Sequence, residues 1–180
     1  MKSQTRLLTL SAMFTALGVL FPMLFHAIGL GAVFLPMFWP IAAAAFFLPL
    51  RETAIVALAA PVLSWLLTGM PPASPPILQV MVFELETLAC TTALLYRKQF
   101  GQWISLAAGL FLSRLTLFLF ILILAPLFGL PQKVFSIGWT LRGVPGLAAM
   151  LLIIPPLAAK VKREKLRVMK KHVETSSPLL

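Results

Sequence analysis

The chain has 180 residues, of which 60% are hydrophobic and 11% are charged, and its mean hydropathy is +0.98. This composition excludes an ordinary soluble domain and predicts an integral membrane protein. The net charge of +10 reflects basic residues just outside the hydrophobic segments. Such residues set membrane orientation and meet anionic lipid headgroups of the bilayer, so we do not expect a nucleic-acid partner.

Six hydrophobic segments follow one another along the chain, and about 20 residues are needed for each helix that spans a bilayer. The second segment is short, and Pro36 and Pro40 interrupt it, so a bent or tilted helix is expected there. The expected spans cover about residues 7–25, 33–48, 53–67, 77–96, 103–128 and 135–159. The sequence therefore predicts an all-α integral membrane protein, with six transmembrane helices in one bundle over residues 1–159 and a basic tail over residues 160–180.

Basic residues lie at alternate ends of these spans, which indicates the orientation of the bundle. One side receives the seven basic residues of the tail together with Lys2, Arg6, Arg51, Arg97 and Lys98. The other side receives only Lys133. Both termini are therefore expected in the cytoplasm, and the turn at His26, the proline-rich loop before the fourth span and the turn at Lys133 are expected on the outer face.

The proline-rich loop and the helix after it form the most unusual stretch of the sequence, LTGMPPASPPILQVMVFELE over residues 67–86. Four prolines donate no backbone hydrogen bonds and have preset φ angles, so the loop can keep one shape at the membrane surface. Glu84 lies about two turns inside the following hydrophobic helix. An ionisable group inside a span is a functional-site candidate.

Four charged residues are expected inside the spans, and their charges sum to zero: Glu84, Glu86, Arg114 and Arg142. One interpretation is that each glutamate pairs with an arginine only to hold helices together. The other is that at least one of these groups lines a polar pocket for a small solute. Glu84 and Glu86 point about 200° apart on a helix, so they cannot both face one cavity. Glu84 carries the binding hypothesis, whereas Glu86 faces elsewhere and balances Arg114.

Aromatic and amide groups at a similar depth complete the candidate pocket: Trp39, Trp65, Gln79 and Trp139. Tryptophans at such positions also serve as interfacial anchors. Trp139 lies three residues before Arg142 on the same helix face, so an aromatic ring beside a guanidinium could receive a flat heterocycle. His26 is interpreted as a turn residue. No residues have metal-ligand spacing, and no nucleotide-binding glycine loop or catalytic triad is visible, so we expect neither a cofactor nor an enzyme.

The first span carries Ala12 and Ala16 four residues apart, followed by Gly18. Small side chains at this spacing form a flat strip that another helix can approach closely. The strip could pack against the protein's own spans. Its position in the cytoplasmic half makes an external partner a second possibility.

With these features, the chain resembles the substrate-binding S components of energy-coupling-factor transporters. The resemblance rests on six spans with both ends inside, on Ala12-x-x-x-Ala16, and on Leu67-Thr-Gly-Met-Pro-Pro72 followed by Phe83-Glu84-Leu85. It covers nearly the whole chain. Around Leu35-Pro-Met-Phe-Trp-Pro40, related sequences often have a histidine after the methionine, whereas this chain has Phe38 and Trp39.

The resemblance implies a multi-pass subunit in a prokaryotic plasma membrane that binds a vitamin-like solute at its outer face. Pyridoxine-like, niacin-like and hydroxymethylpyrimidine-like compounds are implied as the solute class. Its partners would be a transmembrane coupling subunit, docked at Ala12 and Ala16, and two cytoplasmic ATPases. The expected binding residues are Glu84, Arg142, Trp139, Gln79, Trp39 and Arg114. The alternative is a non-catalytic scaffold whose intramembrane charges only hold helices together.

Overall fold

The computed structural model describes residues 2–74, 76–124, 126, 129 and 141–176. All of its regular elements within these residues are helices, which confirms the prediction of an all-α protein. In chain order they are α1 (Lys2–Ala27), α2 (Gly31–Phe34), α3 (Phe38–Phe47), α4 (Leu50–Thr68), α5 (Ile77–Arg97), α6 (Gln102–Leu119), the π-helical turn η1 (Phe120–Leu124) and α9 (Val144–Ser176).

Five stretches of helix are long and apolar enough to span a membrane: Gln4–Ala27, Leu50–Thr68, Ile77–Arg97, Gln102–Ile123 and Val144–Glu164. The predicted second span is instead a shorter apolar segment, Gly31–Phe47. The first part of the predicted sixth span, from residue 135, lies outside the described residues. The chain is therefore a multi-pass membrane protein, and its described residues include five long apolar helices and one short, broken segment.

The break in the second segment lies at residues 35–37, between α2 and α3. Leu35 adopts the left-handed conformation at φ 50° after the last residue of α2, and Pro36 follows it. Pro40 does not break the helix. It is in the first turn of α3, where backbone N–H groups have no partner within the helix, so its missing N–H costs no hydrogen bond. The Trp39 Nε1–H group donates to the Phe34 carbonyl at 2.8 Å and so ties the two short helices together across the break.

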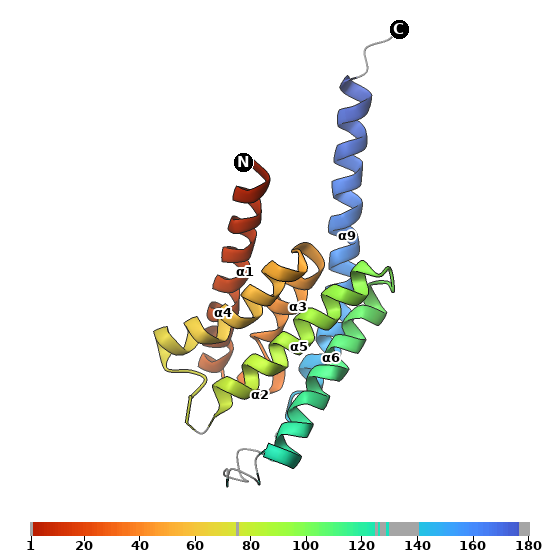
Figure 1. The fold of residues 1–180 in the computed structure, drawn as a ribbon. Helices are drawn as coiled ribbons and strands as arrows, with labels where there is room; N and C mark the ends of the chain where they lie inside the picture. Colours follow the sequence, from red (N-terminus) through yellow and green to blue (C-terminus); the bar gives the residue numbers. More distant parts are fainter. Residues whose placement is uncertain (1, 75, 125, 127–128, 130–140, 177–180) are drawn as a thin grey trace.

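Helix α5 lies at the centre of the bundle and contacts α3, α4 and α6 (Figure 1). The helices α5 and α6 approach closely at Gly109, where a Cβ atom would collide with Thr92 Oγ1 and lie 2.9 Å from the Leu88 carbonyl oxygen. Only a residue without a side chain permits this contact. The antiparallel pair α5–α6 therefore has a fixed register, and this register places charged side chains of the two helices beside each other.

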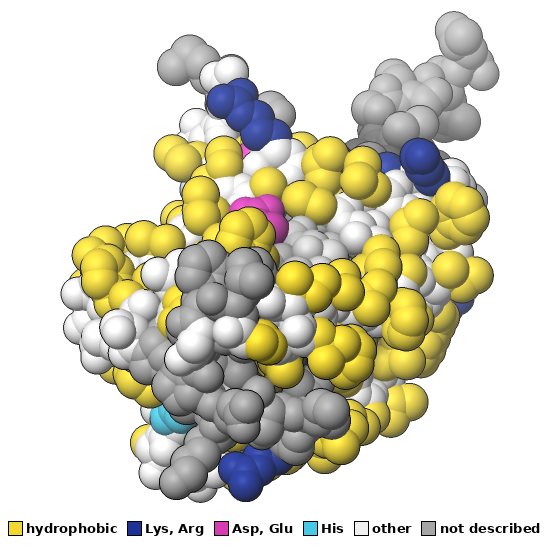
Figure 2. Space-filling model, turned by 60° about the horizontal axis from the view of Figure 1, so that its bottom comes forward, with side chains coloured by type: hydrophobic (Ala, Val, Ile, Leu, Met, Phe, Trp, Pro, Cys, Tyr) yellow, Lys and Arg dark blue, Asp and Glu magenta, His cyan; other side chains and the backbone are white. Residues whose placement is uncertain are grey.

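The two chain ends lie at one end of the bundle in Figure 1, and the turn after α1 and the proline-rich loop lie at the other. Hydrophobic side chains cover most of the described surface in Figure 2, and Lys and Arg side chains gather near the ends of the molecule. The predicted boundary at residue 160 lies inside α9, which continues without interruption to Ser176. A helix of 33 residues is about 50 Å long, so α9 is longer than the roughly 30 Å hydrocarbon core of a bilayer.

Candidate solute-binding cavity

A cavity of about 580 Å³ opens at the end of the bundle opposite the chain termini. Its wall comes from the last turns of α1 and α4, from α2 and the break after it, from the proline-rich loop, and from the facing halves of α5 and α6. The volume is in the range of small-molecule sites. Most of the lining is apolar, and its polar side chains among the described residues are His26, Ser64, Thr68, Glu84 and Arg114.

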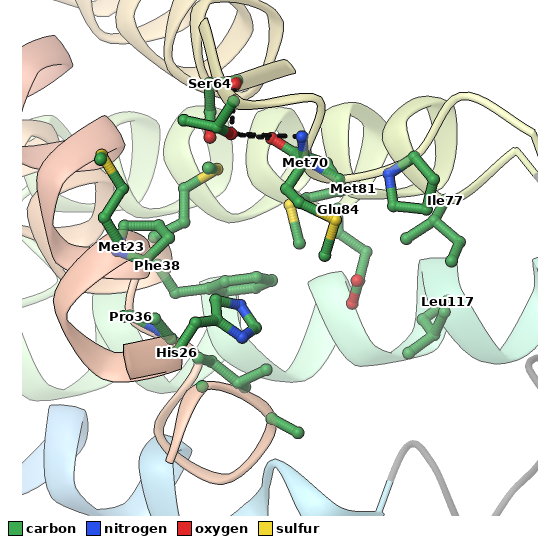
Figure 3. A pocket seen from close by; sticks show the side chains of 18 of the residues that line it. Met23, His26, Pro36, Phe38, Ser64, Met70, Ile77, Met81, Glu84 and Leu117 are labelled. Atoms are coloured by element: carbon green, nitrogen blue, oxygen red, sulfur yellow. Dashed lines mark hydrogen bonds between the residues drawn. The ribbon is translucent and has the colours of Figure 1, made fainter. Parts of the chain in front are cut away.

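The charged centre of the cavity is a pair formed by Glu84 of α5 and Arg114 of α6. Arg114 Nη2 lies 2.7 Å from Glu84 Oε1, and the two side chains are 16% and 7% exposed. Glu84 Oε1 and Arg114 Nη2 are buried and face each other in this ion pair, and Arg114 Nε is buried without a hydrogen-bond partner among the described residues. Figure 3 shows the Glu84 carboxylate pointing into the cavity. Both side chains line the cavity, so a solute in it can meet a carboxylate and a guanidinium at one place.

Phe38 supplies an aromatic surface next to this pair. The Arg114 guanidinium carbon lies 4.8 Å from the centroid of the Phe38 ring, which is within the range of a cation–π interaction. Phe38 is 1% exposed and is the first residue of α3, directly after the chain break. The break in the second segment therefore positions the ring beside the charged pair.

Four thioether side chains line the remaining apolar wall: Met23, Met37, Met70 and Met81. Methionine side chains are flexible and polarisable, and they adapt to the shape of a bound ring. They come from α1, the chain break, the proline-rich loop and α5. The wall is thus built from segments that are far apart in the sequence.

His26 lies at the C-terminal end of α1 and also lines the cavity (Figure 3). Its ring packs against the Cα atom of Gly31, because a Cβ atom at position 31 would lie 2.5 Å from the ring atoms Cε1 and Nδ1. Gly31 is the first residue of α2 and lines the cavity as well. The imidazole position therefore depends on the absence of a side chain at residue 31.

The proline-rich loop forms one wall of the cavity through Met70, Pro71 and Pro72. Gly69 ends α4 in the left-handed conformation at φ 72°, and its N–H group donates to the Trp65 carbonyl at 2.8 Å. The Leu78 N–H group donates to the Pro72 carbonyl at 3.1 Å, which ties the loop to the start of α5. The loop is thus anchored to the bundle at both ends.

Of the predicted binding residues, Glu84 and Arg114 line the cavity, and Trp39, Gln79 and Arg142 do not. Gln79 and Arg142 are exposed, and Trp39 is half-buried and bonded to the Phe34 carbonyl. Trp139 lies outside the described residues. The prediction that Glu86 balances Arg114 is wrong, because Arg114 contacts Glu84. Glu86 instead accepts a hydrogen bond from the Cys90 thiol at 3.6 Å, one helical turn away.

Sequence reasoning did not identify His26, Phe38 or the methionines as lining residues, and it favoured Arg142 as the pocket arginine. The sequence does indicate that Arg114 lies near Glu84. Glu84 lies thirteen residues before Arg97, and Arg114 lies thirteen residues after Gly101, so a short turn between the two spans places both at one depth. Pro36 and Pro40 predicted an interruption in the second segment, and a break lies at residues 35–37, but nothing in the sequence indicated that Phe38 lines the cavity.

Ala12 and Ala16 are both exposed on α1. The opposite face of this helix makes the internal contacts: the Phe14 ring stacks on the Phe47 ring, and Gly18 lies against Ala60 of α4. Two residues of an α-helix that are two positions apart point about 200° away from each other. The alanine strip is therefore not used for packing within the described part of the bundle.

Comparison with known families identifies the class to which this fold and cavity belong. The sequence profile of the family described as "ECF transporter, substrate-specific component" matches residues 6–158. Neither a search of curated proteins nor a search of solved structures gave a match. The chain belongs to this family, as the resemblance found in the sequence predicted. It is a substrate-binding subunit of a transporter and not an enzyme.

Proposed function

We propose that this protein binds a small, largely planar, water-soluble micronutrient in the cavity between α1, α4, α5 and α6, and delivers it across the membrane. The Glu84–Arg114 pair is the observation that carries the proposal. A carboxylate and a guanidinium lie together in the otherwise largely apolar wall of a cavity of suitable size. A bound solute would form further hydrogen bonds with both groups.

Each lining group has a role in this proposal. Glu84 accepts a hydrogen bond from the solute, Arg114 donates to an acceptor on it, and the Phe38 ring supports the Arg114 guanidinium from behind. The proline-rich loop covers one side. Pyridoxine-like, niacin-like and hydroxymethylpyrimidine-like compounds fit these requirements as flat, polar rings. Trp139 stays a prediction as a stacking residue, and Arg142, Gln79 and Trp39 would have to act from outside the described cavity wall.

The proposed partners are a transmembrane coupling subunit and two cytoplasmic ATPase subunits. The exposed strip at Ala12 and Ala16 is the proposed docking surface for the coupling subunit, since small side chains permit close helix approach. In the proposed orientation both termini are cytoplasmic in a prokaryotic plasma membrane, and the cavity faces outward. This orientation lets the protein collect the solute from outside the cell.

The proposal is tested by purifying the full chain from its native membrane and identifying the co-purified small molecules by mass spectrometry. We expect one planar, polar compound at near-stoichiometric amount, and we expect the same compound to raise the thermal stability of the solute-free protein. A folded protein that yields no such compound, and that is stabilised by none of the three compound classes, would contradict the proposal.

A second candidate function is that of a scaffold protein, and the Glu84–Arg114 contact is compatible with it. The Glu84–Arg114 contact joins α5 to α6, so its role could be limited to holding the two helices together. A scaffold predicts that loss of either charge lowers the stability of the protein and that no solute changes it. The ligand-dependent thermal shift separates the two functions.

A further inference from the structure

Building on the proposed function, we infer that the cavity selects a solute without net charge that carries a hydrogen-bond donor and a hydrogen-bond acceptor side by side on one edge of a planar ring. This inference narrows the class of solute, because the three candidate classes include both neutral and anionic compounds. It rests on the opposite charges of Glu84 and Arg114 in the cavity wall and on which of these groups donates and which accepts hydrogen bonds.

The charges of the cavity wall restrict the charge of the solute. Among the described lining residues, Glu84 contributes one negative charge and Arg114 contributes one positive charge. The two charges are in contact at 2.7 Å and lie behind a largely apolar lining. An anionic solute that reaches Arg114 must displace or face the Glu84 carboxylate. A cationic solute that reaches Glu84 must likewise displace or face the Arg114 guanidinium. Either charge leaves one member of the pair buried without a counter-ion, which is unfavourable.

The hydrogen-bonding character of the two charged groups then defines the edge of the solute. The Glu84 carboxylate can only accept hydrogen bonds, and the Arg114 guanidinium can only donate them. Because the two groups are in contact, a solute can engage both when its own donor and acceptor are adjacent. An amide group, or an amino group next to a ring nitrogen, has this pattern. A carboxylate has acceptors only, so it places an oxygen against the oxygen of Glu84.

The Phe38 ring lies behind the guanidinium, 4.8 Å from its central carbon, and is 1% exposed. It supports Arg114 in the cavity wall. A flat solute can lie against this wall while its edge meets Glu84 and Arg114. The methionine side chains at the remaining wall adjust to substituents on the ring, so they add contact area without adding a charge requirement.

The test uses the full chain in lipid nanodiscs at pH 7.5 and two matched pairs of probes. The first pair is nicotinamide and nicotinate. The second pair is an aminopyrimidine with a hydroxymethyl group and the analogue in which a carboxylate replaces that group. Calorimetry measures the dissociation constant of each probe. We expect the neutral member of a pair to bind at least about tenfold more tightly, since a hydrogen bond to a charged group is exchanged for a repulsive contact.

Equal or tighter binding of the acid in either pair would overturn the charge assignment while leaving a solute-binding function in place. No binding by any of the four probes would also count against the inference. Only that result together with the absence of a co-purified compound would contradict the proposed function, so the two failures are distinguishable.

Charge-altering variants give a second measurement. Glu84→Gln leaves the Arg114 charge unbalanced, so we expect the preference between nicotinamide and nicotinate to shift toward the acid. Arg114→Gln is expected to shift it further toward the amide. Glu86→Gln is the matched control, because Glu86 is on the same helix and does not line the cavity. An unchanged preference in both cavity variants would overturn the inference, and the wild-type measurement decides the question if one variant does not fold.

Discussion

Arg114 Nη2 lies 2.7 Å from Glu84 Oε1, which joins the second half of α6 to the first half of α5 at the wall of the cavity. The contact lies at a similar depth in both helices because Glu84 is fourteen residues before the first residue of the turn at 98–101 and Arg114 is thirteen residues after its last. Gly109 lets the two helices approach closely enough for this register to hold. The predictions below concern this pair, the groups around it, the docking surface and the orientation of the bundle.

The Glu84–Arg114 pair should contribute to the stability of the bundle. Removing one member of a buried pair leaves the other charge without a counter-ion and costs about 3 kcal/mol. We expect Glu84→Gln and Arg114→Gln each to lower the free energy of unfolding in detergent. The double variant should lose less than the sum of the two, with a coupling of about 1–3 kcal/mol. Strict additivity would show that the contact carries no interaction energy.

Replacement of Phe38 by Leu should weaken solute binding while preserving a hydrophobic side chain of similar bulk. A ring that holds a ligand-binding guanidinium by a cation–π contact contributes about 0.5–2 kcal/mol, which corresponds to a roughly 2- to 30-fold loss of affinity. Phe46→Leu is the control, because Phe46 lies at the other end of α3 and packs against Tyr96 at 5.0 Å. Calorimetry with the co-purified solute measures both variants. Similar losses in the two variants would argue for a general effect on packing.

A methyl group at residue 31 should displace His26. The Cβ atom of Gly31→Ala would lie 2.5 Å from the imidazole, so the ring must move away from its place in the cavity wall. We expect a weaker affinity for the solute in Gly31→Ala and a smaller effect of the same change in a His26→Ala background, where no ring is present. If Gly31→Ala weakens binding equally in both backgrounds, the effect comes from the backbone of α2 and not from His26.

Ala16→Leu should prevent co-purification with the coupling subunit and leave solute affinity unchanged, because Ala16 is exposed on α1 and far from the cavity lining. Ala107→Leu provides the matched control: Ala107 is also exposed, but it belongs to α6, on which α5 and α9 pack. A pull-down with a tagged coupling subunit measures complex formation. Complex formation by Ala16→Leu at the wild-type level would rule out the alanine strip as the docking surface.

The orientation can be tested with single cysteines in a Cys90→Ala background. Ser74 and Gln99 are both exposed, and they lie in turns at opposite ends of the bundle. We expect a membrane-impermeant maleimide to label Ser74→Cys in intact cells and Gln99→Cys only after the cells are permeabilised. The reverse pattern would place the cavity on the cytoplasmic side and contradict the proposed capture of solute from outside.

Much of the fold could be predicted from the sequence, because hydrophobic length and flanking residues define long spans. The fourth span was expected at about residues 77–96 and is Ile77–Arg97, since Pro76 precedes it and Arg97 closes it. The short second segment was harder to predict. Pro36 and Pro40 look alike in the sequence, but only the first lies at the break, because Leu35 takes the left-handed conformation before it and Pro40 fits the first turn of α3.

The candidate site was less predictable than the fold. Glu84 was identified because an isolated carboxylate inside a span is unusual. The partner of Glu84 depends on helix register. Arg142 was favoured because Glu84 and Arg142 were both expected in the outer half of the bundle, but the α5–α6 hairpin brings Arg114 to Glu84 instead. Phe38 and His26 look like ordinary span and turn residues. Only the packing of α1 against α2 and α3, and of α3 against α5, brings them to the same cavity.

The most direct test of the account is the position of the solute in an experimental structure of the full chain purified with its bound compound. The account predicts a planar ring in the cavity, with one edge within hydrogen-bond distance of Glu84 and Arg114 and one face toward Phe38. A compound bound elsewhere on the protein, with this cavity empty and the Glu84–Arg114 contact unchanged, would contradict it.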